Sequence, residues 1–406
     1  MTPTLVHEVD LSSSFPDVPT DLTAARVLVR LHGTPLGFVE VPITGGVLSA
    51  RLVRERAEAE LPVAEHLASD GAGASACREP GPWPVLGPIG VVLCTRDRED
   101  LLRVALTSVL AACDVVGDRL SEVVVVDNAP RTPATRAVVQ ELNDPRIHYV
   151  LESRPGLSIA RNTGARASTG TIVAFTDDDV IVDSDWLDGL LRGFSRARRI
   201  GCVTGLVPTA ELDTEAQHFF DRKVRWSSTC QPHLFDLTTT EGVLYPYSAG
   251  IFGTGANFAV TREAYDALVG FDEALGAGAP TRGGEDLDWF VRTLTAGYRI
   301  AYEPSAIVWH RHRRDLESLA DQLYGYGTGF TAYLLKQTLS VRGFLAVARR
   351  ILKGLALMSR ANAESLDAGI DPALLKRERI GMLHGPFLYA KARWSLRRAR
   401  YSSSVR

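Results

Sequence analysis

The sequence predicts an α/β fold, and three observations support this class. From residue 89 onward, short apolar runs alternate with amphipathic segments, which is the pattern of a doubly wound parallel sheet. Several of the predicted strands end in polar or acidic residues, and open α/β sheets bind ligands beyond the carboxyl ends of their strands. Finally, residues 172–180 read IVAFTDDDV, in which a buried strand stops in three consecutive carboxylates.

Length and composition limit the class of protein. A chain of 406 residues is expected to hold more than one folding unit, and 45% hydrophobic with 23% charged residues is typical of a soluble globular protein. The five cysteines include no CxxC pair, which favours reduced thiols in a cytoplasmic protein over a zinc knuckle or a disulfide framework. We expect no secretory signal, and no apolar run approaches the ~20 residues that span a bilayer.

The first 70 residues are expected to form a small α+β unit. Residues 27–31 and 38–43 predict the strands of a hairpin, and residues 48–67 predict a helix. Residues 71–88 are rich in Gly, Ala and Pro, as is typical of a linker. No residue of this unit suggests chemistry, so we expect an interaction module or a lid.

The principal unit is expected over residues 89–330. Its first predicted strand, 89–93, is followed by Thr95 and Arg96, and its second, 123–126, ends in Asp127. Predicted helices follow each strand, and a third strand is expected at 147–151. Because successive strands end in polar residues, we expect these side chains to meet at one edge of the sheet.

Asp177, Asp178 and Asp179 would repel one another unless a cation lies among them. Hard divalent cations take oxygen ligands from carboxylates, so the run predicts a metal site at a strand end. The alternative is an acidic turn followed by a helix N-cap. That alternative would account for one or two aspartates, whereas three directly after a buried strand favour the metal.

The same edge suits a nucleotide. Asp127 could accept hydrogen bonds from a base, and Arg161, in the glycine loop that opens a helix, could bind phosphates with both arms of its guanidinium. The alternative for Arg161 is a surface arginine on that helix. The chain has no GxxxxGK[ST] and no GxGxxG after the first strand, which disfavours a Walker A site and a dinucleotide fold.

The second half carries two further candidate sites. Residues 283–290, GGEDLDWF, place Glu285 and Asp286 at a helix start, where acids either stabilise the helix end or act as a general base. A predicted strand at 306–309 ends at His310, which could be a metal ligand, although a lone histidine usually is not. The basic run at 311–314 could neutralise phosphate.

The segment 331–406 is basic, with 15 Lys/Arg against four Asp/Glu, or +11, while the rest of the chain carries −14. A basic tail on an acidic body suggests a polyanionic surface as partner, and helices with aromatic and basic residues can lie on anionic membranes. The alternative is that these helices pack on the body. No motif in the chain is typical of proteins that recognise nucleic-acid bases, so nucleic acid is not an expected partner.

Seven motifs occur in order between residues 88 and 314 and together resemble the family 2 glycosyltransferases, which have a GT-A fold. They are VVLCTRDR, VVVVDN, GLSIARNTG, IVAFTDDDV, GFDEALG, GGEDLDWF and AIVWHRHR. The resemblance implies a nucleotide-sugar donor, a divalent cation (Mn or Mg) and inversion at the anomeric carbon. The Gln-x-x-Arg-Trp motif of processive members is absent, so a single-transfer enzyme is expected.

The resemblance also implies roles for individual residues. The Asp-x-Asp motif falls on Asp177 and Asp179, of which Asp179 would coordinate the metal, with His310 as a further ligand and Asp178 near the ribose or the donor sugar. Asp286 would be the catalytic base, with Glu285 beside it. Asp127 would bind the base, which Thr95 and Arg96 would flank.

Two other functions stay open on the sequence alone. One is a non-catalytic module that binds nucleotide sugars or glycans on the same fold, and the other is a nucleotidyltransferase, which also uses paired aspartates and a metal. The acceptor could be a glycolipid, a polysaccharide or a natural product. The expected location is the cytoplasm, with peripheral contact to the inner face of the membrane through the tail.

Overall fold

The protein is described by a computed structural model. It covers residues 2–64, 87–238, 242, 244–248, 250–350, 353–354, 356 and 371–404. Most of the linker expected at residues 71–88 therefore lies outside the described residues, as do Cys77 and most of the apolar, basic run after residue 350. Within the described chain, none of the helices is long and apolar enough to cross a bilayer.

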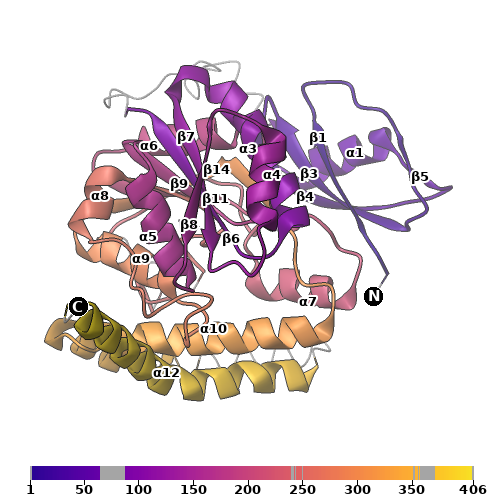
Figure 1. Ribbon diagram of the computed structural model, residues 1–406. Coiled ribbons are helices and arrows are strands. Elements are labelled where there is room, and N and C mark those ends of the chain that lie inside the picture. Colours follow the sequence, from indigo (N-terminus) through magenta and orange to yellow (C-terminus); the bar gives the residue numbers. More distant parts are fainter. Residues whose placement is uncertain are drawn as a thin grey trace.

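The centre of the molecule is a nine-stranded mixed sheet (Figure 1). Four strands run parallel, in the order β9-β6-β7-β8. Beyond β9 the order continues β13-β11-β14-β10, with β12 also paired to β14. The bounds are β6 Ile89–Thr95, β7 Leu120–Asn128, β8 Ile147–Glu152, β9 Ile172–Thr176, β10 Val180–Val182, β11 Ile200–Leu206, β12 His233–Phe235, β13 Asn257–Thr261 and β14 Arg299–His310.

The predicted α/β class is confirmed, but the expectation of an all-parallel sheet is wrong. β13 runs antiparallel to both of its neighbours, β9 and β11, and β10 and β12 run antiparallel to β14. The strand–helix alternation that predicts parallel pairing holds only as far as β9. After β9 the pairing no longer follows the order of the chain, because β13 lies between β9 and β11, and β10 and β12 both pair with β14.

Helices cover both faces of the sheet, so the central strands are buried on both sides and read as continuous apolar runs. One face packs against α3, α4 and α6, and the other against α5, α8 and α9. These helices span Glu99–Val116 (α3), Ala134–Leu142 (α4), Leu157–Ala167 (α5), Trp186–Phe194 (α6), Arg262–Ala267 (α8) and Glu285–Thr295 (α9). The helices predicted after the first three strands and at the acidic motif are confirmed.

The N-terminal residues form a three-stranded sheet of their own, β1 Leu5–Asp10, β3 Ala24–Leu31 and β4 Thr34–Pro42. The predicted hairpin is confirmed as β3–β4, while β1 and the short pair β2 Val18–Pro19 and β5 Val47–Leu48 were not predicted. Helix α1, Ala50–Glu60, begins at the cap residue Ser49. The sheet contacts the main body through ion pairs of Arg26 with Asp221 and of Arg30 with Asp183.

Two C-terminal helices, α10 Leu316–Gln337 and α12 Pro372–Ser404, form a layer below the sheet (Figure 1). They run parallel, since Gly381 lies at Tyr324 and Gly385 lies further along α10 at Thr328. The division expected at residue 331 falls inside α10, so a boundary there would cut a continuous helix. Helix α7, Glu215–Val224, contacts α10 near its start.

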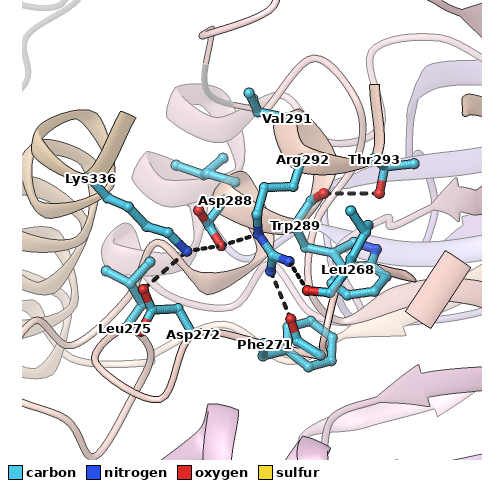
Figure 2. Close-up of polar contacts among 12 residues, drawn as sticks. Leu268, Phe271, Asp272, Leu275, Asp288, Trp289, Val291, Arg292, Thr293 and Lys336 are labelled. Carbon is cyan, nitrogen blue, oxygen red and sulfur yellow. Dashed lines mark hydrogen bonds and ion pairs between the residues drawn. The ribbon is translucent and has the colours of Figure 1, made fainter. Parts of the chain in front are cut away.

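A cluster of charges joins the layers (Figure 2). Asp288 is fully buried in α9 and accepts hydrogen bonds from Arg292 Nε at 2.7 Å and Lys336 Nζ at 2.8 Å. Lys336, from the end of α10, also lies 3.0 Å from Asp272. Arg292 donates to the carbonyls of Leu268 and Gly270. These contacts fix the start of α9 relative to α10, which matters because Glu285 and Asp286 lie there.

Candidate active site

A cleft of about 990 Å³ opens beyond the carboxyl ends of β6 and β9. Its walls come from these strand ends, the loop before β13, the start of α9, and helices α10 and α12. Nine of the ten predicted site residues line it: Thr95, Arg96, Arg161, Asp177, Asp178, Asp179, Glu285, Asp286 and His310. The expectation that the strand-end side chains converge is therefore met by all but Asp127.

Asp177, Asp179 and His310 form a group that could hold a metal ion. One ligand atom of each lies within 4.8 Å of the others, and His310 Nε2 is 3.4 Å from Asp179 Oδ1. Strand pairing explains this, since Val180 of β10 lies opposite His310 of β14. Two carboxylates and an imidazole fit a divalent cation such as Mn²⁺ and leave coordination positions for other ligands.

Arg98, which the sequence analysis missed, holds the other side of the acidic run. Its Nη1 donates to Asp178 Oδ1 at 2.8 Å and to Asp179 Oδ2 at 3.2 Å. Thr95 Oγ1 donates to Asp178 Oδ2 at 2.8 Å. Arg96, predicted for this loop, is more exposed and lies beside Asp97. The mutual repulsion of the aspartates is therefore already reduced by side chains of the protein.

The environments of the aspartates separate their pKa values. Burial raises the pKa of Asp178 to about 6, although Arg98 and Thr95 act in the opposite direction. Burial also acts to raise the pKa of Asp179, but the charges of His310, Arg98 and Arg313 outweigh it and lower that pKa. Asp179 is therefore the carboxylate that is most firmly ionised, as a metal ligand must be.

Arg161 is 1% exposed, so the surface-arginine alternative is wrong. Its Nη1 donates to Glu285 Oε1 at 3.1 Å, and its Nη2 to Asp177 Oδ1 at 3.1 Å and to the Gly255 carbonyl at 2.8 Å. The side chain thus joins the acidic strand end to the start of α9. Because its hydrogen bonds go to protein acceptors, the structure favours a role in holding these groups over the predicted phosphate contact.

Glu285 and Asp286 occupy the first turn of α9, after Gly284 with φ of +88°. Asp286 Oδ2 accepts the Gly255 N–H at 3.0 Å, and Oδ1 accepts the Leu287 N–H at 2.8 Å. Glu285 is buried, and burial together with the charge of Asp286 raises its pKa to about 7 despite Arg161. Asp286 is the less buried of the two and lies at the cleft surface.

Asp127 is the predicted residue that does not line the cleft. It lies opposite Thr95 in the strand register, but it is fully buried and its Oδ2 accepts the Tyr149 hydroxyl at 2.8 Å. Burial raises its pKa, while Tyr149 and Thr135 act in the opposite direction. The next residue, Asn128, lines the cleft instead.

The far wall of the cleft is partly aromatic and comes from segments that were not predicted to contribute to the site. Trp226 follows α7, Tyr326 and Phe330 belong to α10, and Met382 belongs to α12. The ring of Trp226 lies 5.7 Å from that of His310, centroid to centroid. These residues were missed because the helical and aromatic patterns that carry them are also typical of ordinary core packing.

Comparison with known proteins agrees with this geometry. Residues 90–269 match the family model described as glycosyl transferase family 2. The Pre-mycofactocin glycosyltransferase of Mycobacterium tuberculosis is 30% identical over 291 residues, which are 68% of this chain and 54% of that protein. The Succinoglycan biosynthesis protein ExoM of Rhizobium meliloti is 32% identical over 237 residues, 57% of this chain and 69% of that protein. This chain thus spans about half the length of the first of these relatives.

A mannosyltransferase from Pyrobaculum calidifontis, solved with GDP-Man and Mn²⁺, superposes with a TM-score of 0.48 at 18% identity. The superposition covers 82% of this chain and 97% of that one. The α/β sheet, its flanking helices and the acid-lined cleft agree with the architecture that the seven motifs predict. The chain belongs to glycosyl transferase family 2. This confirms the resemblance seen in the seven motifs.

Proposed function

We propose that the protein is an inverting, metal-dependent glycosyltransferase that moves one sugar from a nucleotide-sugar donor to an acceptor hydroxyl. The observation that supports this best is that the Asp177–Asp179–His310 group and Asp286 line one cleft. A divalent ion, Mn²⁺ or Mg²⁺, would supply Lewis-acid stabilisation of the leaving diphosphate. We also expect the protein to contact a membrane surface.

The donor side of the cleft is the edge formed by β6, β7 and β9. Asp179, Asp177 and His310 would hold the ion, and Asp178 would lie near the ribose or the donor sugar. Thr95, Arg96 and Asn128 would flank the base. Asp127 would bind the base from behind this wall, since its Oδ2 accepts the Tyr149 hydroxyl while its buried Oδ1 has no hydrogen-bond partner among the described residues.

Asp286 is the proposed catalytic base. It would take the proton of the acceptor hydroxyl as that oxygen bonds to the anomeric carbon, while the bond from this carbon to the diphosphate oxygen breaks on the opposite face. Such an attack inverts the anomeric configuration, and a positioned base contributes typically ~10²–10⁴-fold. The N–H groups of Gly255 and Leu287 hold the carboxylate in place, and the Gly255 carbonyl is in turn fixed by Arg161.

The acceptor side is the wall of Trp226, Tyr326 and Phe330. Flat aromatic side chains offer apolar contact to the C–H face of a sugar or to a ring of a natural product. One relative is named for pre-mycofactocin and the other for succinoglycan biosynthesis, so the relatives do not agree on one product. We propose a cytoplasmic location, which is supported by the free, buried thiols of Cys94, Cys113, Cys202 and Cys230.

The test is release of nucleoside diphosphate from UDP-, GDP- and dTDP-sugars with Mn²⁺ or Mg²⁺. We expect slow, metal-dependent hydrolysis of one donor that is lost in Asp179→Ala. The matched control is Asp118→Ala, an exposed aspartate in the turn after α3. If no nucleotide sugar is turned over and none binds in a metal-dependent manner, the proposed site is wrong.

A further inference from the structure

Helix α12 exposes large apolar side chains. Leu383, Phe387 and Trp394 are 72%, 77% and 58% exposed. Their spacings of four and seven residues place them on one face of the helix. In Figure 1, α12 lies along the outside of α10, on the side away from the sheet. We call this surface the outer face of α12, and we define it by these three residues and the exposed cations Lys376, Arg379, Lys391 and Arg398.

The outer face is not used in the packing of the protein that the structure describes. The buried residues of α12 are Leu374, Leu375, Gly381, Gly385, Tyr389 and Ala392, which repeat on the opposite side of the helix. Gly381 and Gly385 meet the backbone of α10, and Tyr389 donates a hydrogen bond to Asp272. Packing within the described residues therefore accounts for the buried side of α12. It does not account for the large apolar side chains of Leu383, Phe387 and Trp394 on the other side.

Charge on this helix is almost entirely positive. From Pro372 to Ala399 the sequence carries seven Lys/Arg and a single acid, Glu378. Glu378 points inward and pairs with Lys223 at 2.7 Å, so it does not neutralise the outer face. The guanidinium of Arg398 lies 4.7 Å from the ring centre of Trp394. An apolar strip with basic flanks is typical of helices that lie in a membrane interface.

We propose that the outer face of α12 docks on an anionic lipid surface. Headgroups would neutralise the cations while Leu383, Phe387 and Trp394 enter the boundary of the acyl chains. A second copy of this chain fits less well, because a two-fold contact would bring the same cations together. A nucleic acid would satisfy the charges but leave the apolar side chains against a polar backbone.

The inner side of the same helix lines the cleft through Glu378 and Met382. A helix with its side chains is about 10–12 Å across, so docking would bring the cleft to within about one helix diameter of the headgroups. An acceptor hydroxyl attached to a lipid could then reach Asp286. This last step rests on the proposed transferase function, whereas docking itself does not.

The test is co-sedimentation of the full chain with vesicles of phosphatidylcholine, alone or mixed with phosphatidylglycerol in equal parts. We expect binding to the mixed vesicles only, weakened by salt because the attraction is partly electrostatic. The double variant Leu383→Ser/Phe387→Ser should bind about tenfold more weakly or worse. The matched control, Val115→Ser/Leu151→Ser, removes two exposed apolar residues of α3 and β8 and should bind as the wild type does.

A second pair of changes, Arg379→Gln/Lys391→Gln, should weaken binding and reduce its salt dependence. Donor hydrolysis in solution should be unchanged in both α12 variants, which separates this proposal from the transferase proposal. The docking proposal is overturned if the wild type ignores anionic vesicles or if the Leu383/Phe387 variant binds them equally well. It is also overturned if these variants instead abolish dimerisation or retention on nucleic acid.

Discussion

At the scale of single residues, Arg161 is the side chain that joins the two halves of the site. It contacts Asp177 on one side and Glu285 on the other, and its guanidinium lies 5.6 Å and 5.9 Å from the ring centres of Phe258 and Phe271. Removing a buried charge of this kind is costly, because the partner carboxylates then stay buried without a neutralising positive charge.

We therefore expect Arg161→Met to lower the free energy of unfolding by about 3–5 kcal/mol. Urea denaturation followed by circular dichroism measures this change. Arg166→Met is the control on the same helix, since Arg166 is exposed and should change stability by less than about 0.5 kcal/mol. Equal effects of the two changes would show that the ion pairs of Arg161 contribute nothing particular.

Asp286 gives a second prediction. Asp286→Asn keeps an oxygen that can accept the Gly255 N–H but removes the proton acceptor. Turnover should fall about 10²–10⁴-fold, while the dissociation constant of the donor with Mn²⁺ stays near that of the wild type. Steady-state kinetics and calorimetric titration of the donor give the two quantities. Loss of donor binding in step with turnover would argue against a role as base.

Among the residues that sequence reasoning found, the three aspartates are neighbours both in the sequence and in space. Asp177, Asp178 and Asp179 follow one strand, so their clustering needs no tertiary information. The partners of Arg161 lie at Asp177, Gly255 and Glu285, and only the last two are distant in the chain. Arg98 was missed because an arginine after a strand resembles any surface arginine until the strand register is known.

At the scale of elements, the glycines of α10 show how helices form the cleft wall. A Cβ at Gly327 would lie 2.1 Å from the Glu378 carbonyl oxygen of α12, whereas a Cβ at Gly325 would have its nearest contact at 3.4 Å from Arg282 Cβ. Both positions are inside the same helix, where alanine is intrinsically preferred to glycine by about 1 kcal/mol.

The two substitutions should therefore have different effects on the stability of the protein. Gly325→Ala is expected to be neutral or slightly stabilising, and Gly327→Ala to cost about 1–3 kcal/mol because α10 and α12 must move apart. Thermal unfolding of the two variants beside the wild type measures this. If both stabilise equally, α12 does not pack on α10 as closely as described.

Glu122 gives an element-scale prediction on pH, since it joins β7 to the end of α5. Burial acts to raise its pKa, but hydrogen bonds from Thr169, Ser168 and Ser121 outweigh this and lower the pKa below its usual 4.5. A carboxylate with a lowered pKa in the folded state adds stability above the unfolded pKa, and this stability is lost as pH falls through the folded pKa.

The unfolding free energy of the wild type should thus fall more steeply below about pH 4.5 than that of Glu122→Gln, which cannot titrate. Urea unfolding at a series of pH values between neutral and mildly acidic tests this. Parallel profiles for the two proteins would mean that Glu122 has the same pKa in the folded and unfolded states.

Among the elements, those with a clear hydrophobic pattern could be predicted from the sequence, and those without such a pattern could not. β6, β7 and β9 each contain four consecutive apolar residues, and α3 and α9 have apolar stripes, so each is visible in the sequence. β11, by contrast, contains Gly201 and Gly205, and strand patterns with glycine are weak. The direction of β13 depends on its pairing partners, which no local pattern encodes.

At the scale of the whole molecule, the site is assembled from segments that are far apart in the chain. The predicted ligands of the metal come from the end of β9 and the end of β14, two strands that are far apart in the chain. The strand ends of β6 and β9 could be predicted from the sequence, whereas the wall contributed by α10 and α12 could not, because its position follows from packing alone.

A bound ion would therefore stabilise the entire fold and not one loop. With Mn²⁺ at a hundredfold excess over its dissociation constant, the gain is about 2.7 kcal/mol for a ligand that binds only the folded state. We expect Mn²⁺ to raise the melting temperature of the wild type and of Asp118→Ala. Asp179→Ala should show no such rise in differential scanning calorimetry; a rise equal to that of the wild type would place the ion elsewhere.

The contact between Gly284 and Gly329 has a consequence for how this chain can vary over evolution. A Cβ at Gly284 would lie 2.4 Å from the Gly329 carbonyl oxygen, and a Cβ at Gly329 would lie 2.5 Å from the Gly283 carbonyl carbon. Neither position can gain a side chain unless the helix moves away from the catalytic turn. Relatives that keep α10 in this place should retain both glycines, and relatives that lose one should have lost the constraint on the other.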